Sequence, residues 1–159
     1  MATTFRESRN VELSLLFYLD TNLAIDWPGT TLAKTFHQVF AKDVDLPVVL
    51  VRLADVDSTR REVGSSTLEN RYLMIVDVFA RSDAQRLDMA DYIKDKIKEG
   101  WIHYDHSHAS GDKTTLTRVA NRRDWVTEFV SDSRVDAGET VDTKDKFRQT
   151  ISFMVRFAS

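Results

Sequence analysis

The spacing of hydrophobic residues along the chain predicts two main helices. Val11, Leu15 and Leu19 recur at helical spacing and give the first helix one apolar stripe. This helix is expected over residues 8–21, and its first residue is a serine of the kind that caps helix N-termini. The Trp-Pro-Gly sequence at 27–29 predicts the turn or loop that follows.

The second helix is predicted between Ser82 and Gly100. Ser82 followed by Gln85 has the spacing of a capping box, in which each side chain satisfies a backbone N–H of the first turn. Gly100 suits the position just after a helix, where the backbone often takes a positive φ. The expected buried stripe consists of Leu87, Met89, Ala90, Ile93 and Ile97.

Runs of β-branched and aromatic residues predict the strands in the middle of the chain. Residues 48–53 form one strand that begins after Pro47, and the polar residues 55–64 are expected as a turn or strand end. The clearest strand covers 69–80, and because both of its faces are mostly apolar, we expect a cover on both sides. The second cover can come from a neighbouring subunit. Residues 30–41 fit either period.

Two further long strands are expected towards the end of the sequence, after a short strand at 101–104. Residues 114–130 read as one extended strand or two, and residues 147–157 alternate cleanly between apolar and polar positions. We expect these two runs to pair as a long antiparallel hairpin. Residues 131–146 between them lack apolar periodicity and are predicted to be a flexible loop.

Together these elements predict a single α+β domain over residues 1–159. The expected sheet is mixed and mainly antiparallel, with two main helices packed on one face and a long C-terminal β-hairpin. A chain of 159 residues, 42% hydrophobic and 30% charged, has the composition of one ordinary globular domain.

Charge and composition narrow the possible partners. The net charge is −3, whereas duplex DNA and anionic lipid need a basic surface, so we expect neither sequence-specific nucleic acid nor a membrane as a partner. The chain has no cysteine, which removes disulfides and thiolate catalysis. No stretch approaches the roughly 20 apolar residues of a membrane helix.

Four acidic and imidazole side chains lie close together at His103, Asp105, His106 and His108. Zinc needs three or four ligands that converge on one point, and a local cluster in a polar loop rarely supplies them. We therefore favour a solvated loop and expect no metal and no cofactor. A small-molecule or metal-binding module that uses this cluster stays as an alternative.

No other constellation predicts an enzyme. The carboxylate pairs Asp43 with Asp45 and Asp55 with Asp57 flank predicted turns, where aspartate is favoured for local hydrogen bonding. No glycine-rich phosphate loop and no nucleophile elbow is present. Because no nucleophile, base and orienting group come together, we expect a protein that is not an enzyme.

Asp77 stands in the middle of an apolar strand, where an unpaired carboxylate would be costly. Either it forms a buried ion pair with an arginine, which can lie across a subunit boundary, or it faces a wetter part of the sheet. The arginines near the predicted hairpin form no basic patch, because acidic residues interleave with them. They are Arg118, Arg122, Arg123 and Arg134, with Trp125 beside them.

The order of segments resembles small tail-terminator or head–tail joining proteins of long-tailed bacteriophages. The features that carry the resemblance are an N-terminal helix, the strand LPVVLVR, the turn REVGS, the strand RYLMIVDVFA, a helix with QRLDMADYI, and a last strand alternating Phe, Ile, Phe, Val, Phe. They span most of the chain and include no catalytic motif. The resemblance implies an α+β fold and a hexameric ring that stops growth of the tail tube and joins tail to head.

The resemblance also implies partners and a place of action. We expect a homo-oligomeric ring on the tail that contacts the tail tube protein and a neck or head-completion protein, in the virion after assembly in the host cytoplasm. The residues expected to contact a subunit or the tube are Arg60, Arg61, Asp77, Arg134, Asp136, Glu139 and Lys144. Another phage neck or minor tail connector protein is the nearest alternative.

Overall fold

A computed structural model describes residues 7–60, 62–64, 68–105, 117–135, 144 and 146–158, and it has the predicted α+β class. The helices are α1 (Glu7–Asp26), α2 (Phe36–Val39) and α3 (Asp83–Ile97). The strands are β1 (Thr31–Ala33), β2 (Val48–Arg60), β3 (Leu68–Ala80), β4 (Trp101–Asp105), β5 (Thr117–Val135) and β6 (Phe147–Ala158). They form one sheet in the order β1-β2-β3-β6-β5-β4, in which only β1 and β2 are parallel.

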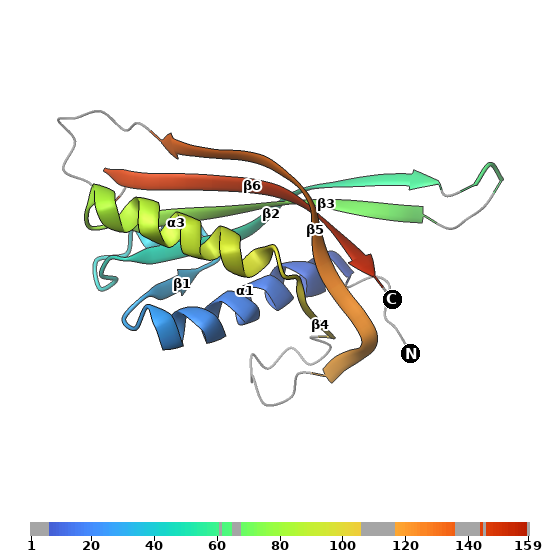
Figure 1. The fold of residues 1–159 in the computed structure, drawn as a ribbon, viewed down its shortest axis with the longest axis horizontal. Helices are drawn as coiled ribbons and strands as arrows, with labels where there is room; N and C mark the ends of the chain where they lie inside the picture. The colour runs from blue at the N-terminus through green and yellow to red at the C-terminus, as the bar shows by residue number, and fades with distance from the viewer. Residues whose placement is uncertain are drawn as a thin grey trace.

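The strand that comes last in chain order lies in the centre of this sheet. β6 pairs with β3 through Tyr72–Ala80 on one side and with β5 through Arg123–Val135 on the other. The predicted antiparallel hairpin of β5 and β6 is therefore confirmed. Figure 1 shows β5 and β6 crossing the molecule side by side, with β5 curving strongly towards β4.

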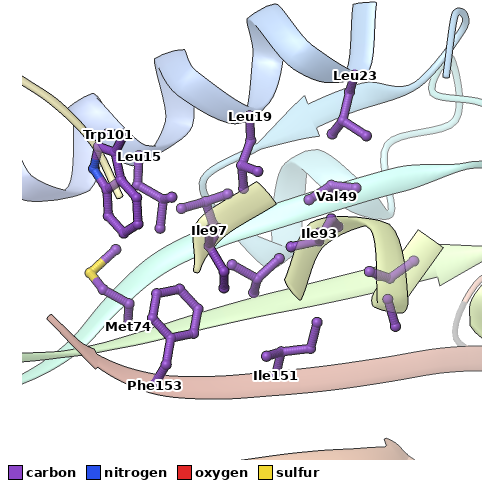
Figure 2. Packing of buried hydrophobic residues seen from close by; sticks show 14 of the residues in the cluster. Leu15, Leu19, Leu23, Val49, Met74, Ile93, Ile97, Trp101, Ile151 and Phe153 are labelled. Carbon is purple, nitrogen blue, oxygen red and sulfur yellow. The ribbon is translucent and has the colours of Figure 1, made fainter. Parts of the chain in front are cut away.

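The two long helices pack on the same face of the sheet, as predicted. Figure 2 shows Leu15, Leu19 and Leu23 pointing from α1 towards the sheet, and Ile93 and Ile97 entering the same core from α3. The strands contribute alternate residues to this core, which are fully buried. They are Val49, Val51, Tyr72, Met74, Val76, Val78, Ile151, Phe153 and Val155.

The opposite face of the sheet is covered in part by the chain itself. The short helix α2 and the loop after it bury Phe79, Leu50 and Val48 beneath Val39. The expectation that a neighbouring subunit supplies this cover is thus not needed at this end of the sheet. The sequence did not predict this cover from within the chain, because residues 30–41 combine a three-residue strand, β1, with a four-residue helix, α2. Neither element is long enough to give a clear hydrophobic period.

The ends of α3 lie where they were predicted, but only half of the predicted capping box is present, because the side chain of Gln85 accepts from the N–H of Arg81. The hydroxyl of Ser82 accepts a hydrogen bond from the backbone N–H of Gln85, and Gly100 takes a φ of +75°. The buried stripe of α3 differs at one position. The prediction that Leu87 is buried is wrong, since 46% of this residue is exposed. Arg86 occupies the stripe in its place, because its guanidinium is satisfied by Asp83 and Gln149 inside the fold.

Three predicted boundaries change. α1 continues past residue 21 to Asp26, and β2 continues through the expected polar turn to Arg60, because β3 pairs with it as far as Leu68. Residues 131–135 are strand rather than loop, since they pair with Arg148–Ser152 of β6. The extensions of β2 and β5 contain few hydrophobic residues, and cross-strand hydrogen bonds stabilise these two segments instead. Within the described residues, no helix is long and apolar enough to span a bilayer.

Candidate functional site

Asp77 is a fully buried charge in the sheet, and its partner lies within the same chain. It is fully buried, and one carboxylate oxygen accepts hydrogen bonds from Nε and Nη2 of Arg148, at 3.2 and 3.0 Å, and from the hydroxyl of Thr150. The sheet register explains this, because Asp77 stands directly opposite Thr150 and diagonal to Arg148. The predicted ion pair is present, but it crosses no subunit boundary.

A second arginine approaches Asp77 from the other side. Nε of Arg52 lies 3.6 Å from the other carboxylate oxygen, which is an ionic contact too long for a hydrogen bond. The guanidinium groups of Arg52 and Arg148 each lie 5.0 Å from the centre of the Phe36 ring. The cluster therefore has two positive groups and one negative group, with the ring of Phe36 packed against both guanidinium groups. The two arginines neutralise the charge of the buried carboxylate. The sequence interpretation missed Arg52.

His103 is buried in β4 rather than placed in a solvated loop. Its Nδ1 lies 3.1 Å from a carboxylate oxygen of Asp124, which is also buried. Burial raises the pKa of the Asp124 carboxyl above its usual value, and the adjacent His103 opposes that rise. His106 and His108 lie outside the described residues. Among the residues that are described, no group of three or more ionisable side chains is arranged to hold a metal.

The candidate carboxylate pairs do not form a site. Asp43, Asp45, Asp55 and Asp57 are all exposed. Asp55 accepts a hydrogen bond from the backbone N–H of Val56 at 2.9 Å, which is the local role expected of an aspartate at an irregular strand position. β2 has an irregularity in its register at this point, between Leu53 and Asp55.

The β2–β3 hairpin extends beyond the rest of the sheet. β6 pairs with β3 only as far as Tyr72, while β2 and β3 continue to pair up to Arg60 and Leu68. Figure 1 shows this hairpin projecting at the right of the molecule. The predicted contact residue Arg60 is exposed at its end, beside the described residues 62–64. Arg61 lies outside the described residues.

The candidate residues of the predicted loop are separated by the structure. Arg134 is exposed near the end of β5, whereas the ammonium group of Lys144 donates to the backbone carbonyls of Val39, Ala41 and Val44 at 2.6–2.9 Å. Lys144 thus fastens the segment after α2 and is not available for a partner. Asp136 and Glu139 lie outside the described residues.

The outer edge of β5 has little strand cover. Within the described residues, β4 pairs with β5 only between Thr117 and Asp124, so no strand covers its outer edge from Trp125 to Val135. Phe129 and Val130 on this segment are 40% and 54% exposed. Two register irregularities interrupt the edge, a device that limits open-ended strand pairing.

A groove of about 350 Å³ lies between α1 and β4, and sequence analysis did not foresee it. Its walls include Phe17, Tyr18, Trp101, Ile102, Tyr104 and Arg123, and we call it the aromatic groove. Tyr18 donates its hydroxyl to the Lys96 carbonyl at 2.9 Å, and burial raises its pKa. Ser14 closes the outer edge of β4, since its hydroxyl bonds both the N–H and the carbonyl of Tyr104.

Arg123 lies at the groove and is held by its own chain. It donates to the Glu99 carbonyl at 3.2 Å and stacks against Trp125, with 5.1 Å between the guanidinium carbon and the ring centre. Acidic residues neighbour the arginines along β5, as expected, and Glu128 contacts Arg71 at 3.7 Å. The arrangement suits contacts with a mixed-charge protein surface better than with a nucleic-acid backbone.

No protein-family model matches the sequence, and a search of curated proteins gives no significant match. What the chain does has therefore to be inferred from its surfaces. These surfaces combine a projecting hairpin, a partly uncovered sheet edge and an aromatic groove, all of which are suited to protein contacts.

Proposed function

We propose that this chain is a structural virion assembly protein, a phage tail terminator that caps the tail tube as a ring and joins the tail to the head. It acts by shape and interface, without catalysis, metal or cofactor. Its partners are other copies of itself, the tail tube protein and a neck or head-completion protein.

The projecting β2–β3 hairpin is the observation that best supports this proposal. A two-stranded ribbon has little stability alone in water, and this one extends past Tyr72, the last residue of β3 that pairs with β6. Such an extension gives the domain no additional core. It is useful when another protein surface receives it, as in a ring or at the end of a tube.

The charge of the chain is consistent with the same role. With a net charge of −3, the protein has no general attraction for DNA phosphates. A ring through which DNA passes needs a surface to which the DNA does not adhere. The order of segments along the chain, which resembles tail terminators, supports the proposal independently.

The test combines the mass in solution with binding to tails. We expect light scattering and negative-stain imaging to show a closed ring with an open centre, either for the free protein or after incubation with purified tail tubes. On tubes, the ring is expected at one end only. Tubes whose ends stay bare at saturating protein would reject the terminator role.

A further inference from the structure

The end of the projecting hairpin exposes aliphatic side chains to water. Val63 is fully exposed, at 107% of its reference area, and Leu68 is 54% exposed. Polar and charged residues surround them on the hairpin, including Ser58, Asn70 and Arg60. Two aliphatic groups at the end of a polar projection have the composition of a small docking element, apolar in the centre and polar at the rim.

The aromatic groove has complementary properties on another part of the molecule. Phe17, Tyr18, Trp101 and Tyr104 are among the residues that line it, and its volume of about 350 Å³ is at the lower end of the range for binding pockets. These rings already contact one another: Phe17 and Tyr104 meet edge to face at 5.2 Å, and Tyr18 stacks on Trp101 at 5.9 Å. The walls are therefore fixed by packing, which favours aliphatic side chains that need no hydrogen bond.

We propose that the hairpin end of one copy docks Val63 and Leu68 into the aromatic groove of a second copy. This inference rests on the proposed assembly function and names the contact that joins the subunits. In Figure 1 the hairpin points away from α1 and β4, so the groove of the same copy is out of its reach. Joining two different patches of one chain is a head-to-tail contact, the kind that closes into rings.

The charges at the two surfaces are complementary. Glu99 and Arg123 lie at the groove, and Arg60, Arg61 and Glu62 precede Val63 in the sequence at the hairpin end. Each surface thus has charges of both signs. One orientation brings Arg60 towards Glu99 and Glu62 towards Arg123, and the reverse orientation is disfavoured by like charges.

Disulfide trapping tests the contact directly, because the chain contains no cysteine. Two separate variants are made, Val63→Cys at the hairpin end and Thr21→Cys in the groove, where Thr21 is exposed. We expect a disulfide-linked pair to form on mild oxidation of the mixture and only trace linking in either variant alone. Mass spectrometry of the linked peptides identifies the two positions.

A matched control uses Ala84→Cys, which is exposed on α3 away from the groove. Mixed with Val63→Cys, it should link at the trace level of random collisions. Equal linking in the two mixtures, or stronger linking of Val63→Cys with itself, would overturn the inference. So would the absence of any link both in free solution and on tail tubes.

A charged substitution gives a second, independent readout. We expect Val63→Asp to weaken self-association at least tenfold, because it places a carboxylate against aromatic residues and adds a second negative charge beside Glu99. Val63 is exposed in the single copy, so the variant should fold normally. Unchanged association overturns the inference.

Failure of this inference and failure of the proposed function can be told apart. If tails are capped by a ring without the Val63–Thr21 link, the terminator role stands and this contact is wrong. If the link forms but tails stay uncapped, the contact stands and the terminator role is wrong.

Discussion

A single buried carboxylate, Asp77, organises the polar cluster on the sheet face that α2 covers in part. Leu50 stands opposite it on β2, and two arginines reach it along the diagonals of the sheet. The side chain of Arg148 is 16% exposed, whereas that of Arg52 is 36% exposed. The contact with Arg148 therefore loses less to solvent screening and matters more for stability.

Replacing Asp77 by asparagine should lower the free energy of unfolding by about 3–5 kcal/mol, because it leaves the charge of Arg148 unpaired inside the protein. Urea unfolding measures the change. Asp88→Asn on the exposed side of α3 is the control and should stay within about 0.5 kcal/mol of wild type. If both variants unfold alike, the buried pair has no special role. Adding Arg148→Met to Asp77→Asn should cost less than the sum of the single changes.

Tyrosine hydroxyl groups make the fold sensitive to alkali. Burial, together with the bond that its hydroxyl donates to Glu7, raises the pKa of Tyr72 well above the usual 10.0, and burial with Asp26 does the same for Tyr92. A raised pKa in the folded state means that the folded protein holds the proton longer. Stability from this source is therefore complete below pH 10.0 and is lost as the pH rises above it.

Tyr72→Phe removes that pH dependence for one proton. Above pH 10, we expect the unfolding free energy of wild type to fall more steeply than that of the variant, by up to about 1.4 kcal/mol per pH unit. Unfolding curves at several alkaline pH values measure the two slopes, and tyrosinate absorbance follows the titration. Parallel slopes for the two proteins would contradict the assignment.

At the scale of elements, the junction between α3 and β4 depends on Gly100. Its φ is +75°, and a Cβ atom there would lie 2.8 Å from a ring carbon of Trp125 and 2.9 Å from the Asp124 carbonyl oxygen. The turn therefore needs glycine both for its backbone conformation and for the close approach of β5. It also sets where Trp101 enters the core and the groove wall.

Gly100→Ala should destabilise the protein by more than Gly29→Ala, which serves as the matched control. Gly29 also has a positive φ, of +88°, but an added Cβ would meet nothing within 4 Å. We expect about 1–2 kcal/mol for Gly29→Ala from the left-handed backbone alone, and a larger loss for Gly100→Ala. Thermal unfolding followed by circular dichroism compares the two. Equal losses would show that the contact with Trp125 relaxes freely.

The sequence predicts those elements whose signals are local. The cap at Ser82, the alternation in β6 and the double-faced strand β3 all depend on neighbours in the sequence, and all are found. The sequence pattern assigned Leu87 to the core because it is hydrophobic, whereas its neighbour Arg86 is charged. In the structure Arg86 is buried and Leu87 is exposed. Only the contact with Gln149, a residue of β6, allows an arginine there. The aromatic groove was missed for the same reason, since its walls come from α1, β4 and β5.

At the scale of the whole molecule, three elements are tied together by a chain of polar contacts. Gln149 donates to Asp132 at 2.6 Å, and Lys94 of α3 contacts the same carboxylate at 3.0 Å. This holds the end of β5 close to α3 and fixes the position of Arg134, two residues further along. Arg134 is therefore displayed on a rigid support, as a contact residue needs to be.

Arg134→Glu should leave the fold intact and reduce capping of tail tubes. The side chain is exposed, so we expect the unfolding free energy to change by no more than about 0.5 kcal/mol. Electron microscopy of tube ends, scored at several protein concentrations, measures capping. Arg9→Glu on the exposed side of α1 is the control, and an equal loss of capping in both variants would remove Arg134 from the contact surface.

The central position of β6 has a consequence for how the protein is made. β1, β2 and β3 on one side and β4 and β5 on the other share the sheet only through β6. While the ribosome is still synthesising residues 147–158, α1 connects the two halves through contacts with β2 and β4, but no strand completes the sheet between them. We therefore expect the sheet to be completed only when β6 is available, and the many distant contacts that β6 makes to slow this step.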